Sequence, residues 1–393
     1  MVECSRKLSL LPPYLFSRIN ELKRQAYEQK HDVIDLCMGN PDLATHKNII
    51  DRLCDTVQHH KGTHRYPQAK GMPKFRHTIS RWFYKRFGVD LDPNKEIIAL
   101  IGSKEGIANV FTAYLDPGDT VLVPDPTYPV HFNGVHLAGG KIETMPLLPQ
   151  NNFIPDLSQI KPETARKAKI MILCYPHNPT TGVVENLDFF KNVVQFAKEY
   201  NILICHDNAY SELTFDGYTA PSFLEVPGAK DVSIEFHSFS KTFSMCGWRI
   251  GFAVGSNKLL GPLEKLKSFI DFGVPTFIQL AAVKALLDYD EIVPHIVDVY
   301  RKRRDKLVTG LQKIGWELEK PKATMYVWAP IPKKFNMNSL EFSEALIQET
   351  GVVVAPGVGF GPGGEGFVRF ALVTHDNRYH DALLRIKKFS NKY

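Results

Sequence analysis

The sequence predicts an α/β protein whose larger domain contains a mostly parallel sheet flanked by helices, with a second, smaller α+β domain. Three observations support this. The chain has 393 residues, more than one ordinary core holds, and 44% of them are hydrophobic. From about residue 97, continuous apolar runs alternate with helical patterns, as in parallel sheets buried on both faces. Late in the chain, shorter apolar runs are separated by helical patterns, which indicates the smaller domain.

The predicted elements follow this order along the chain. Residues 14–30 have a helical pattern and lead to a short apolar strand at 33–38. The main series has strands at 97–101, 120–123, 170–174, 202–205, 232–237 and 250–254, and helices at 72–87, 104–115, 187–200, 256–271 and 276–313. Later strands are expected at 326–328, 352–355 and 368–372. We expect residues 1–48 to form an N-terminal arm and part of the small domain, 49–290 the large domain, and 291–393 the small C-terminal domain.

The charge pattern argues against nucleic acid as a partner. The formal net charge is +6, a small excess for this length, and the basic residues are not gathered on one stripe. The densest basic run, residues 301–304, lies in a helical pattern and precedes Asp305, so we interpret it as a solvated helix face. The charge is compatible with small anionic ligands.

No segment has the pattern of a membrane span or an export signal. No apolar stretch approaches the roughly 18 residues that a span needs, and two prolines at 12–13 interrupt the apolar run near the start. The six cysteines are irregularly spaced without a CxxC pair, which argues against a zinc site or a disulfide framework. We therefore expect a cytoplasmic protein with reduced thiols and no metal, with Cys174 and Cys205 in the core.

The segment at 238–251 is the strongest candidate for chemistry, because a strand leads into it and another leaves it. Ligands of open α/β sheets bind beyond the carboxyl ends of the strands, so Lys241 is well placed to form a Schiff base with a carbonyl cofactor. Desolvation beside Arg249 would lower the pKa of that lysine. The planar guanidinium of Arg249 suits a phosphate.

Three other strand ends carry polar residues. Asp207 ends an apolar strand and Tyr210 follows three residues later; the acid either pairs with a protonated pyridine nitrogen or caps the next turn. Asn178 lies in a Pro/Gly turn and either donates to a phenolic oxygen of the cofactor or is only part of that turn. Ser103 and Lys104 begin a helix, where free backbone N–H groups attract a phosphate.

A glycine pattern at 359–364 satisfies G-x-G-x-x-G. The third glycine is followed by a predicted strand, whereas binding of a dinucleotide requires a helix at that place. We therefore interpret this segment as a loop and exclude a nucleotide-binding dehydrogenase.

Taken in this order, these segments resemble the fold-type I, class I/II aminotransferases, which use pyridoxal 5′-phosphate (PLP). Ser238-x-x-Lys241 with Arg249 eight positions after the lysine resembles their lysine and phosphate-arginine signature. Residues 177–182 resemble their Asn-Pro-Thr-Gly turn with one threonine inserted, and Asp207-x-x-Tyr210 resembles their acid and phenol. The resemblance covers nearly the whole chain and implies a seven-stranded sheet in the large, PLP-binding domain.

The resemblance also implies a role for each candidate residue. Lys241 would hold the cofactor and transfer a proton at the substrate, with Asp207 on the ring nitrogen and Tyr210 and Asn178 near the phenolic oxygen. Tyr128 would stack on the ring, and Arg369 would clamp the substrate α-carboxylate, with Gly39 and Asn178 also contacting the substrate. The phosphate would be bound by Ser103, Lys104, Ser238, Arg249 and, across a homodimer, Tyr66 of the partner.

Within the family, residues 11–14, 38–42, 102–106 and 322–328 resemble bacterial glutamate–pyruvate (alanine) aminotransferases most. This implies transfer of an amino group from alanine to 2-oxoglutarate, giving pyruvate and glutamate. Aspartate and LL-diaminopimelate stay open as substrates, and a PLP-dependent C–S lyase on the same fold is a further alternative.

Overall fold

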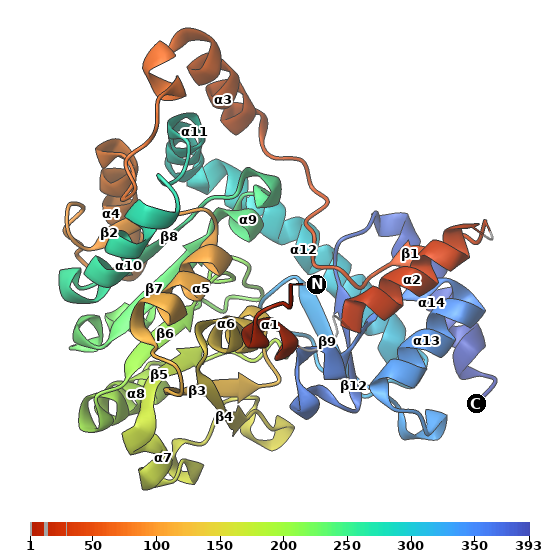
Figure 1. Ribbon diagram of the computed structural model, residues 1–393. Coiled ribbons are helices and arrows are strands. Elements are labelled where there is room, and N and C mark those ends of the chain that lie inside the picture. The colour runs from red at the N-terminus through yellow and green to blue at the C-terminus, as the bar shows by residue number, and fades with distance from the viewer. Residues whose placement is uncertain (1, 12–14, 29) are drawn as a thin grey trace.

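The computed structural model describes residues 2–11, 15–28 and 30–393, and the chain forms two lobes (Figure 1). The large lobe contains a seven-stranded sheet in the order β2-β8-β7-β6-β5-β3-β4. Its strands are β2 (Ile97–Leu100), β3 (Thr120–Asp125), β4 (Lys141–Pro146), β5 (Ala168–Leu173), β6 (Leu203–Asp207), β7 (Ser233–Ser238) and β8 (Gly251–Gly255). All run parallel except β8, which is antiparallel to both of its neighbours. The predicted α/β class with a mostly parallel, seven-stranded sheet is confirmed.

Helices cover both faces of this sheet. The helices of this lobe are α3 (Lys47–His59), α4 (Pro73–Phe87), α5 (Ser103–Tyr114), α6 (Val130–Ala138), α7 (Pro162–Lys167), α8 (Asp188–Tyr200), α9 (Phe239–Thr242), α10 (Asn257–Ile270) and α11 (Thr276–Leu287). Of these, α3 packs against α11 rather than on the sheet. Alternate side chains of β5 enter two separate cores: Ile170 and Ile172 pack with residues of α5, α6 and α10, whereas Met171 and Leu173 pack with residues of α4 and α8. Burial of every side chain on both faces explains why the central strands read as continuous apolar runs.

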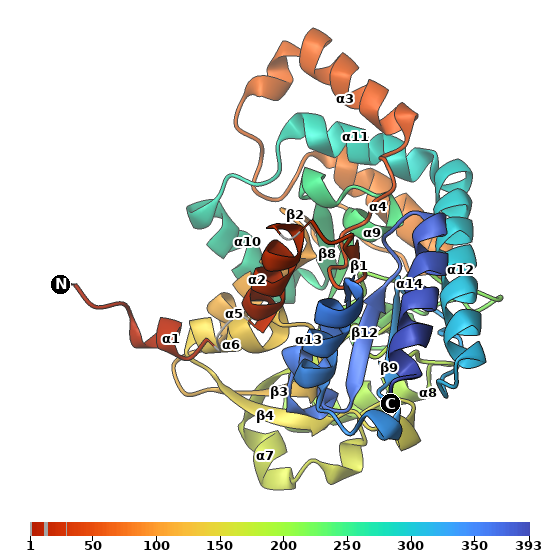
Figure 2. The same cartoon turned by 90° about the vertical axis from the view of Figure 1, so that its right-hand side faces the viewer.

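The smaller lobe is built around a three-stranded antiparallel sheet, in the order β11-β12-β9. Its elements are β9 (Tyr326–Pro330), α13 (Ser339–Thr350), β10 (Val352–Val353), β11 (Ala355–Pro356), β12 (Phe367–Ala371) and α14 (Asp376–Ser390). The N-terminal part adds α2 (Leu15–Glu28) and β1 (Ile34–Asp35) to this lobe, and β1 pairs with β10. The short helix α1 (Arg6–Ser9) instead packs against α6 of the large lobe. Figure 2 shows α2 packed beside α13.

A long helix, α12 (Tyr289–Lys313), runs from one lobe into the other (Figure 1). The single helix expected at 276–313 was wrong, because the chain leaves the helical path at Asp288, between α11 and α12. Among the helices that the structure describes, none is long and apolar enough to cross a bilayer.

The interpretation of residues 301–304 as a solvated helix face was also wrong for two of the four. Arg303 and Arg304 are only 4% and 1% exposed. Arg303 donates to both carboxylate oxygens of Asp42, at 2.6 and 2.9 Å, and Arg304 does the same with Asp216, at 2.7 and 3.1 Å. Each buried guanidinium therefore holds α12 against a segment distant in the sequence.

Candidate active site

A cavity of about 840 Å³ lies at the carboxyl ends of the sheet strands and is lined by residues of both lobes. Its lining includes every predicted site residue except Tyr66. These residues are Gly39, Ser103, Lys104, Tyr128, Asn178, Asp207, Tyr210, Ser238, Lys241, Arg249 and Arg369. The folding of the chain thus brings these residues from well separated segments to one place.

Lys241 lies on the short helix α9, in the connection between β7 and β8. Ser238 caps this helix by accepting a hydrogen bond from the backbone N–H of Ser240 at 3.2 Å. The amine of Lys241 donates to the carbonyl oxygen of Gly39 at 2.8 Å. Burial is the largest effect lowering the pKa of this amine, and the positive charges of Arg369 and Arg249 act in the same direction. A lowered pKa makes the neutral amine, which is the nucleophilic form, easier to reach.

Asp207 ends β6 and directs its carboxylate into the cavity. Nε2 of His131 donates to Oδ2 of Asp207 at 3.3 Å, while Nδ1 of the same ring lies 2.7 Å from the hydroxyl of Thr127. The other oxygen, Oδ1, is buried and has no hydrogen-bond partner. Since a buried carboxylate oxygen without a donor is costly, this atom marks a place where a ligand N–H fits.

Arg369, on β12, is held between two aromatic rings. Its guanidinium carbon lies 4.0 Å from the ring centre of Tyr326 and 4.4 Å from that of Phe360. It donates to Oδ1 of Asn178 at 2.7 Å and to the carbonyl oxygen of Cys37 at 3.1 Å. Its Nε–H is buried without a partner, so the fork keeps donors free for a carboxylate.

The opposite end of the cavity is suited to an anion. Ser103 and Lys104 begin α5, whose first N–H groups have no partner within the helix. The preceding residue, Gly102, has a φ of 84°, and a Cβ there would lie 2.7 Å from Nη2 of Arg249, so only glycine lets the guanidinium approach the start of the helix. The amine of Lys104 lies 5.9 Å from the ring centre of Tyr128.

Tyr210 lies close to a second tyrosine that the sequence did not single out as a site residue. Its hydroxyl is 3.0 Å from that of Tyr326, the first residue of β9, which also lines the cavity. Burial raises the pKa of Tyr210. Burial alone would also raise the pKa of Tyr326, but the positive charges of Arg369 and Lys241 outweigh it and lower this pKa. His131 was missed as well, because nothing in its local sequence points to Asp207.

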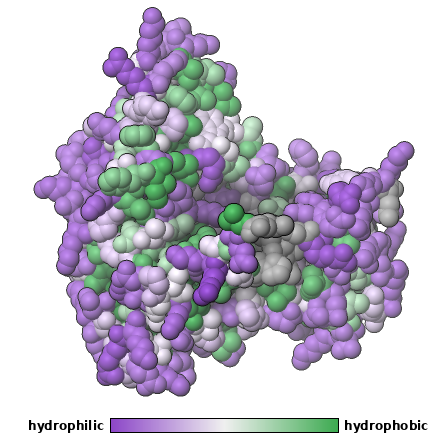
Figure 3. Space-filling model, viewed as in Figure 1, coloured by the Kyte–Doolittle hydropathy of each residue, from purple (hydrophilic) through white to green (hydrophobic). Residues whose placement is uncertain are grey.

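Tyr66 lies outside this cavity. It is 85% exposed, and its ring centre is 4.9 Å from that of Phe272. Phe269 and Ile270, in the last turn of α10, are also exposed. Figure 3 shows a hydrophobic patch over the segment that joins α10 and α11. The structure of one chain therefore does not bring Tyr66 together with the other predicted residues.

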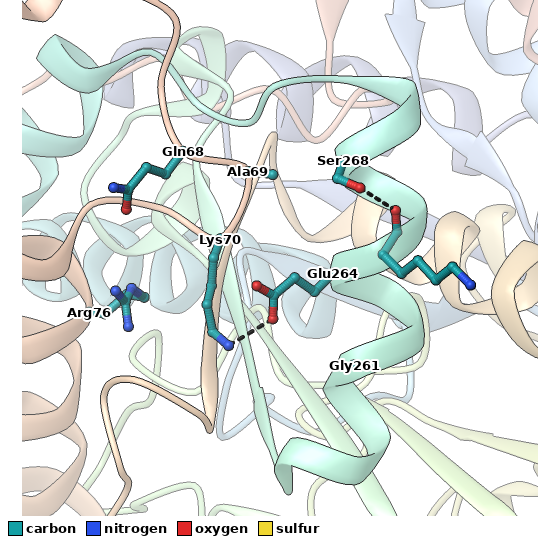
Figure 4. Close-up of a pocket in the computed structure, with 8 residues that line it drawn as sticks. Gln68, Ala69, Lys70, Arg76, Gly261, Glu264 and Ser268 are labelled. Atoms are coloured by element: carbon teal, nitrogen blue, oxygen red, sulfur yellow. Dashed lines mark hydrogen bonds and ion pairs between the residues drawn. The ribbon is translucent and has the colours of Figure 1, made fainter.

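A second cavity, of about 560 Å³, lies between α10 and the chain that leads to α4 (Figure 4). Lys70 and Glu264 face one another there, with Nζ 2.7 Å from Oε2. Arg76, at its edge, donates to the carbonyl oxygen of Gly71 at 3.1 Å. These charges are satisfied within the chain, so this cavity is a weaker candidate than the first.

A buried lysine and an aspartate at neighbouring strand ends, opposite an arginine from the smaller lobe, are the arrangement of the fold-type I enzymes. The family model for aminotransferase class I and II matches residues 31–386, and the chain belongs to this family. The protein is therefore an aminotransferase. The predicted family and enzyme class are confirmed.

Several known proteins are similar over nearly the whole chain. The LL-diaminopimelate aminotransferase of Moorella thermoacetica is 46% identical, covering 99% of this chain and 98% of its own. The glutamate-pyruvate aminotransferase AlaC of Escherichia coli is also 46% identical, covering 97% and 92%. Among solved structures, substrate-bound BacF of Bacillus subtilis superposes with a TM-score of 0.94 at 35% identity, covering 99% and 98%. An aspartate aminotransferase double mutant of Thermus thermophilus gives 0.92 at 26%, covering 99% and 100%.

Proposed function

We propose that this aminotransferase is PLP-dependent and transfers the amino group of alanine to 2-oxoglutarate, giving pyruvate and glutamate. The observation that carries the proposal is the position of Lys241, Asp207 and Arg369 around one cavity. A single carboxylate-binding arginine facing a buried amine suits an α-amino acid, whose carboxylate and α-carbon are one bond apart.

The residues present fit PLP. A protonated pyridine nitrogen would give Oδ1 of Asp207 the donor that it lacks. A phosphate would find the start of α5, Ser238 and the guanidinium of Arg249 at the other end of the cavity. When bound, PLP supplies an electrophilic ring that takes up the electrons released at the α-carbon of the substrate.

The side chains of the protein then have separate tasks. Arg369, fixed by Asn178 and by two aromatic rings, binds the α-carboxylate and orients the substrate. Lys241, with its lowered pKa, accepts the proton of the substrate α-carbon and would deliver it to the cofactor, a task that typically accelerates such reactions by about 10²–10⁴-fold. His131 holds the carboxylate of Asp207 in place, so that its other oxygen would face the ring nitrogen.

The proposal for alanine rests on the similarity to the glutamate-pyruvate aminotransferase of Escherichia coli. One observation favours LL-diaminopimelate as the second candidate. Lys23 and Asp35 form an ion pair at the cavity wall, and such a pair is complementary to the ammonium and carboxylate at the distal end of diaminopimelate. The LL-diaminopimelate aminotransferase relatives add to this alternative.

The deciding experiment is a panel of amino donors against pyruvate and 2-oxoglutarate, read as ratios of kcat/KM. We expect alanine with 2-oxoglutarate to have the highest value. A higher value for LL-diaminopimelate, or for aspartate, would replace alanine as the substrate. Release of pyruvate from cystathionine without an amino acceptor would instead identify a C–S lyase.

The lysine assignment has its own test. We expect Lys241→Ala to lose both turnover and the visible absorbance of covalently bound cofactor, while Lys104→Ala should only weaken binding of the cofactor. An unchanged visible spectrum in Lys241→Ala would contradict the assignment.

We further propose that the protein is a cytoplasmic homodimer in which Tyr66 of one chain reaches the phosphate of the other. The exposed patch of Tyr66, Phe269, Ile270 and Phe272 supports an interface, and the six free thiols fit a reducing compartment. Mixing inactive Lys241→Ala chains with Tyr66→Ala chains tests this. Hybrid dimers contain one site with neither change, so about half of the wild-type activity per hybrid is expected, whereas no recovery would contradict a shared site.

A further inference from the structure

Tyr326 contacts three of the predicted site residues: Tyr210, Arg369 and Gly39. It begins β9, is 3% exposed and lines the cavity. Its hydroxyl is 3.0 Å from that of Tyr210, and its ring lies 4.0 Å from the guanidinium of Arg369. A Cβ on Gly39 would lie only 2.0 Å from this hydroxyl, so Gly39 packs directly against it.

The backbone before Tyr326 is held in a conformation that fixes this position. Thr324 has a φ of 75°, which is unusual for a β-branched residue. Its N–H donates to the carbonyl oxygen of Leu213 in the large lobe at 2.8 Å, and its hydroxyl accepts from the N–H of Tyr326 at 3.2 Å. A strained residue that its surroundings hold on both sides points to a functional constraint nearby.

We propose that Tyr326 is a positioning residue of the transamination site: its hydroxyl polarises Tyr210 toward the cofactor, and its ring carries Arg369 in the orientation that receives the substrate carboxylate. The proposal rests on the PLP-dependent function argued above. One side chain would thus connect the cofactor end of the cavity with the carboxylate end.

The direction of the Tyr210–Tyr326 hydrogen bond follows from the single hydrogen that each hydroxyl carries. When Tyr210 donates its hydrogen to an oxygen of the cofactor, the contact of 3.0 Å needs the hydrogen of Tyr326, so Tyr326 donates and Tyr210 accepts. The positive charge of Arg369 lowers the pKa of Tyr326 and burial raises that of Tyr210, which favours the same direction. Because a hydrogen bond received by a hydroxyl strengthens the one it donates, Tyr326 makes Tyr210 a better donor.

Two substitutions distinguish the role of the Tyr326 ring from that of its hydroxyl. Tyr326→Phe keeps the ring under Arg369 and removes the donor. With a weaker donor at Tyr210, the cofactor oxygen holds more negative charge and the nitrogen that joins Lys241 to the cofactor keeps its proton to higher pH. We expect the pH midpoint of the visible absorbance change to rise by about half a unit or more, with KM for alanine within about twofold of wild type because the ring contact is kept.

Tyr326→Leu removes the ring as well. Loss of a buried cation–π contact should weaken binding of propionate, an unreactive carboxylate of alanine size, by about tenfold in a spectroscopic titration. Tyr326→Phe should bind propionate as wild type does. Tyr218→Phe is the matched control, because it removes a phenol hydroxyl that donates to the carbonyl oxygen of Val184 at 2.8 Å, away from the cavity lining.

The outcomes separate this proposal from the function on which it rests. If wild type shows no visible absorbance with PLP, the proposed function fails. If wild type shows it but Tyr326→Phe has an unchanged or lower midpoint, the role of the hydroxyl is overturned. Propionate binding by Tyr326→Leu that equals wild type overturns the role of the ring, and equal melting temperatures of the variants exclude simple misfolding as the cause of a positive result.

Discussion

A buried carboxylate beneath the candidate site offers a sharp test of the electrostatic reasoning. Glu235, in the middle of β7, is fully buried and accepts hydrogen bonds from five groups on three segments. Nδ1 of His206 and the N–H of Phe223 donate to Oε2 at 2.9 and 2.7 Å. Nε2 of His237, the hydroxyl of Ser222 and the amide of Asn208 donate to Oε1 at 2.7, 2.8 and 3.4 Å. The perturbation is Glu235→Gln, which keeps the shape and removes the charge.

The structure sets the size of the effect. An amide nitrogen in place of Oε2 would face the N–H of Phe223, which cannot become an acceptor. In place of Oε1, it would face the hydroxyl of Ser222 and the amide of Asn208, which can both turn, and the ring of His237, which can take the other tautomer, so we expect this second orientation. The remaining bonds change from charged to neutral acceptors, and the loss of charge-assisted bonding in a buried site should reduce the free energy of unfolding by about 2–4 kcal/mol.

The pH dependence provides the second half of the assay. Burial opposes ionisation of Glu235, but the hydrogen bonds from His206 and His237 outweigh it and hold its pKa far below the ordinary value of 4.5. A lowered folded-state pKa stabilises the protein above the unfolded-state value, and this stability is lost as the pH falls below about 4.5. Guanidinium titrations of wild type and variant should therefore differ most at neutral pH and converge on acidification. A difference below about 0.5 kcal/mol at pH 7, where surface changes usually fall, would refute the argument; the exposed Glu143→Gln is the control.

Three further substitutions test the cavity itself. Arg369→Lys replaces a planar fork by a point charge, so kcat/KM for the amino donor should fall by about 100-fold or more, mainly through KM; a loss below about fivefold would contradict a carboxylate clamp. Asp42→Asn leaves Arg303 with weaker partners, so the free energy of unfolding of this variant should be lower than that of wild type by about 2 kcal/mol. Equal guanidinium midpoints of variant and wild type would show that the pair contributes little. Gly39→Ala would place a methyl group 2.0 Å from the Tyr326 hydroxyl, so kcat should fall while the free energy of unfolding changes little, and an unchanged kcat would contradict this close contact.

The sequence predicts the sheet well where its strands are buried on both faces. Residues 170–173 of β5 and 203–205 of β6 are apolar because their side chains enter the two cores. The polar residues that follow such runs, Asp207 and Lys241 among them, meet at one edge because parallel strands end there. Strand ends therefore identified most of the candidate site.

The missed features depend on contacts that local sequence does not encode. The edge strand β4 pairs only with β3 and exposes most of its side chains, so it has no continuous apolar run. Arg303 and Arg304 look solvated in the sequence and are buried only because distant aspartates meet them. Tyr326 contacts Tyr210, which is 116 residues away in the sequence, so no rule of sequence spacing could have predicted this contact.

The reversed direction of β8 affects how the site responds to insertions in the chain. Because β7 and β8 are antiparallel neighbours, the amine of Lys241 and the guanidinium of Arg249 belong to a single hairpin. Both side chains lie in the connection whose two ends are brought together by the backbone hydrogen bonds between β7 and β8. Insertions elsewhere in the chain can reshape the substrate end of the cavity while leaving this connection intact, whereas a one-residue slip between the two strands would displace its ends relative to one another.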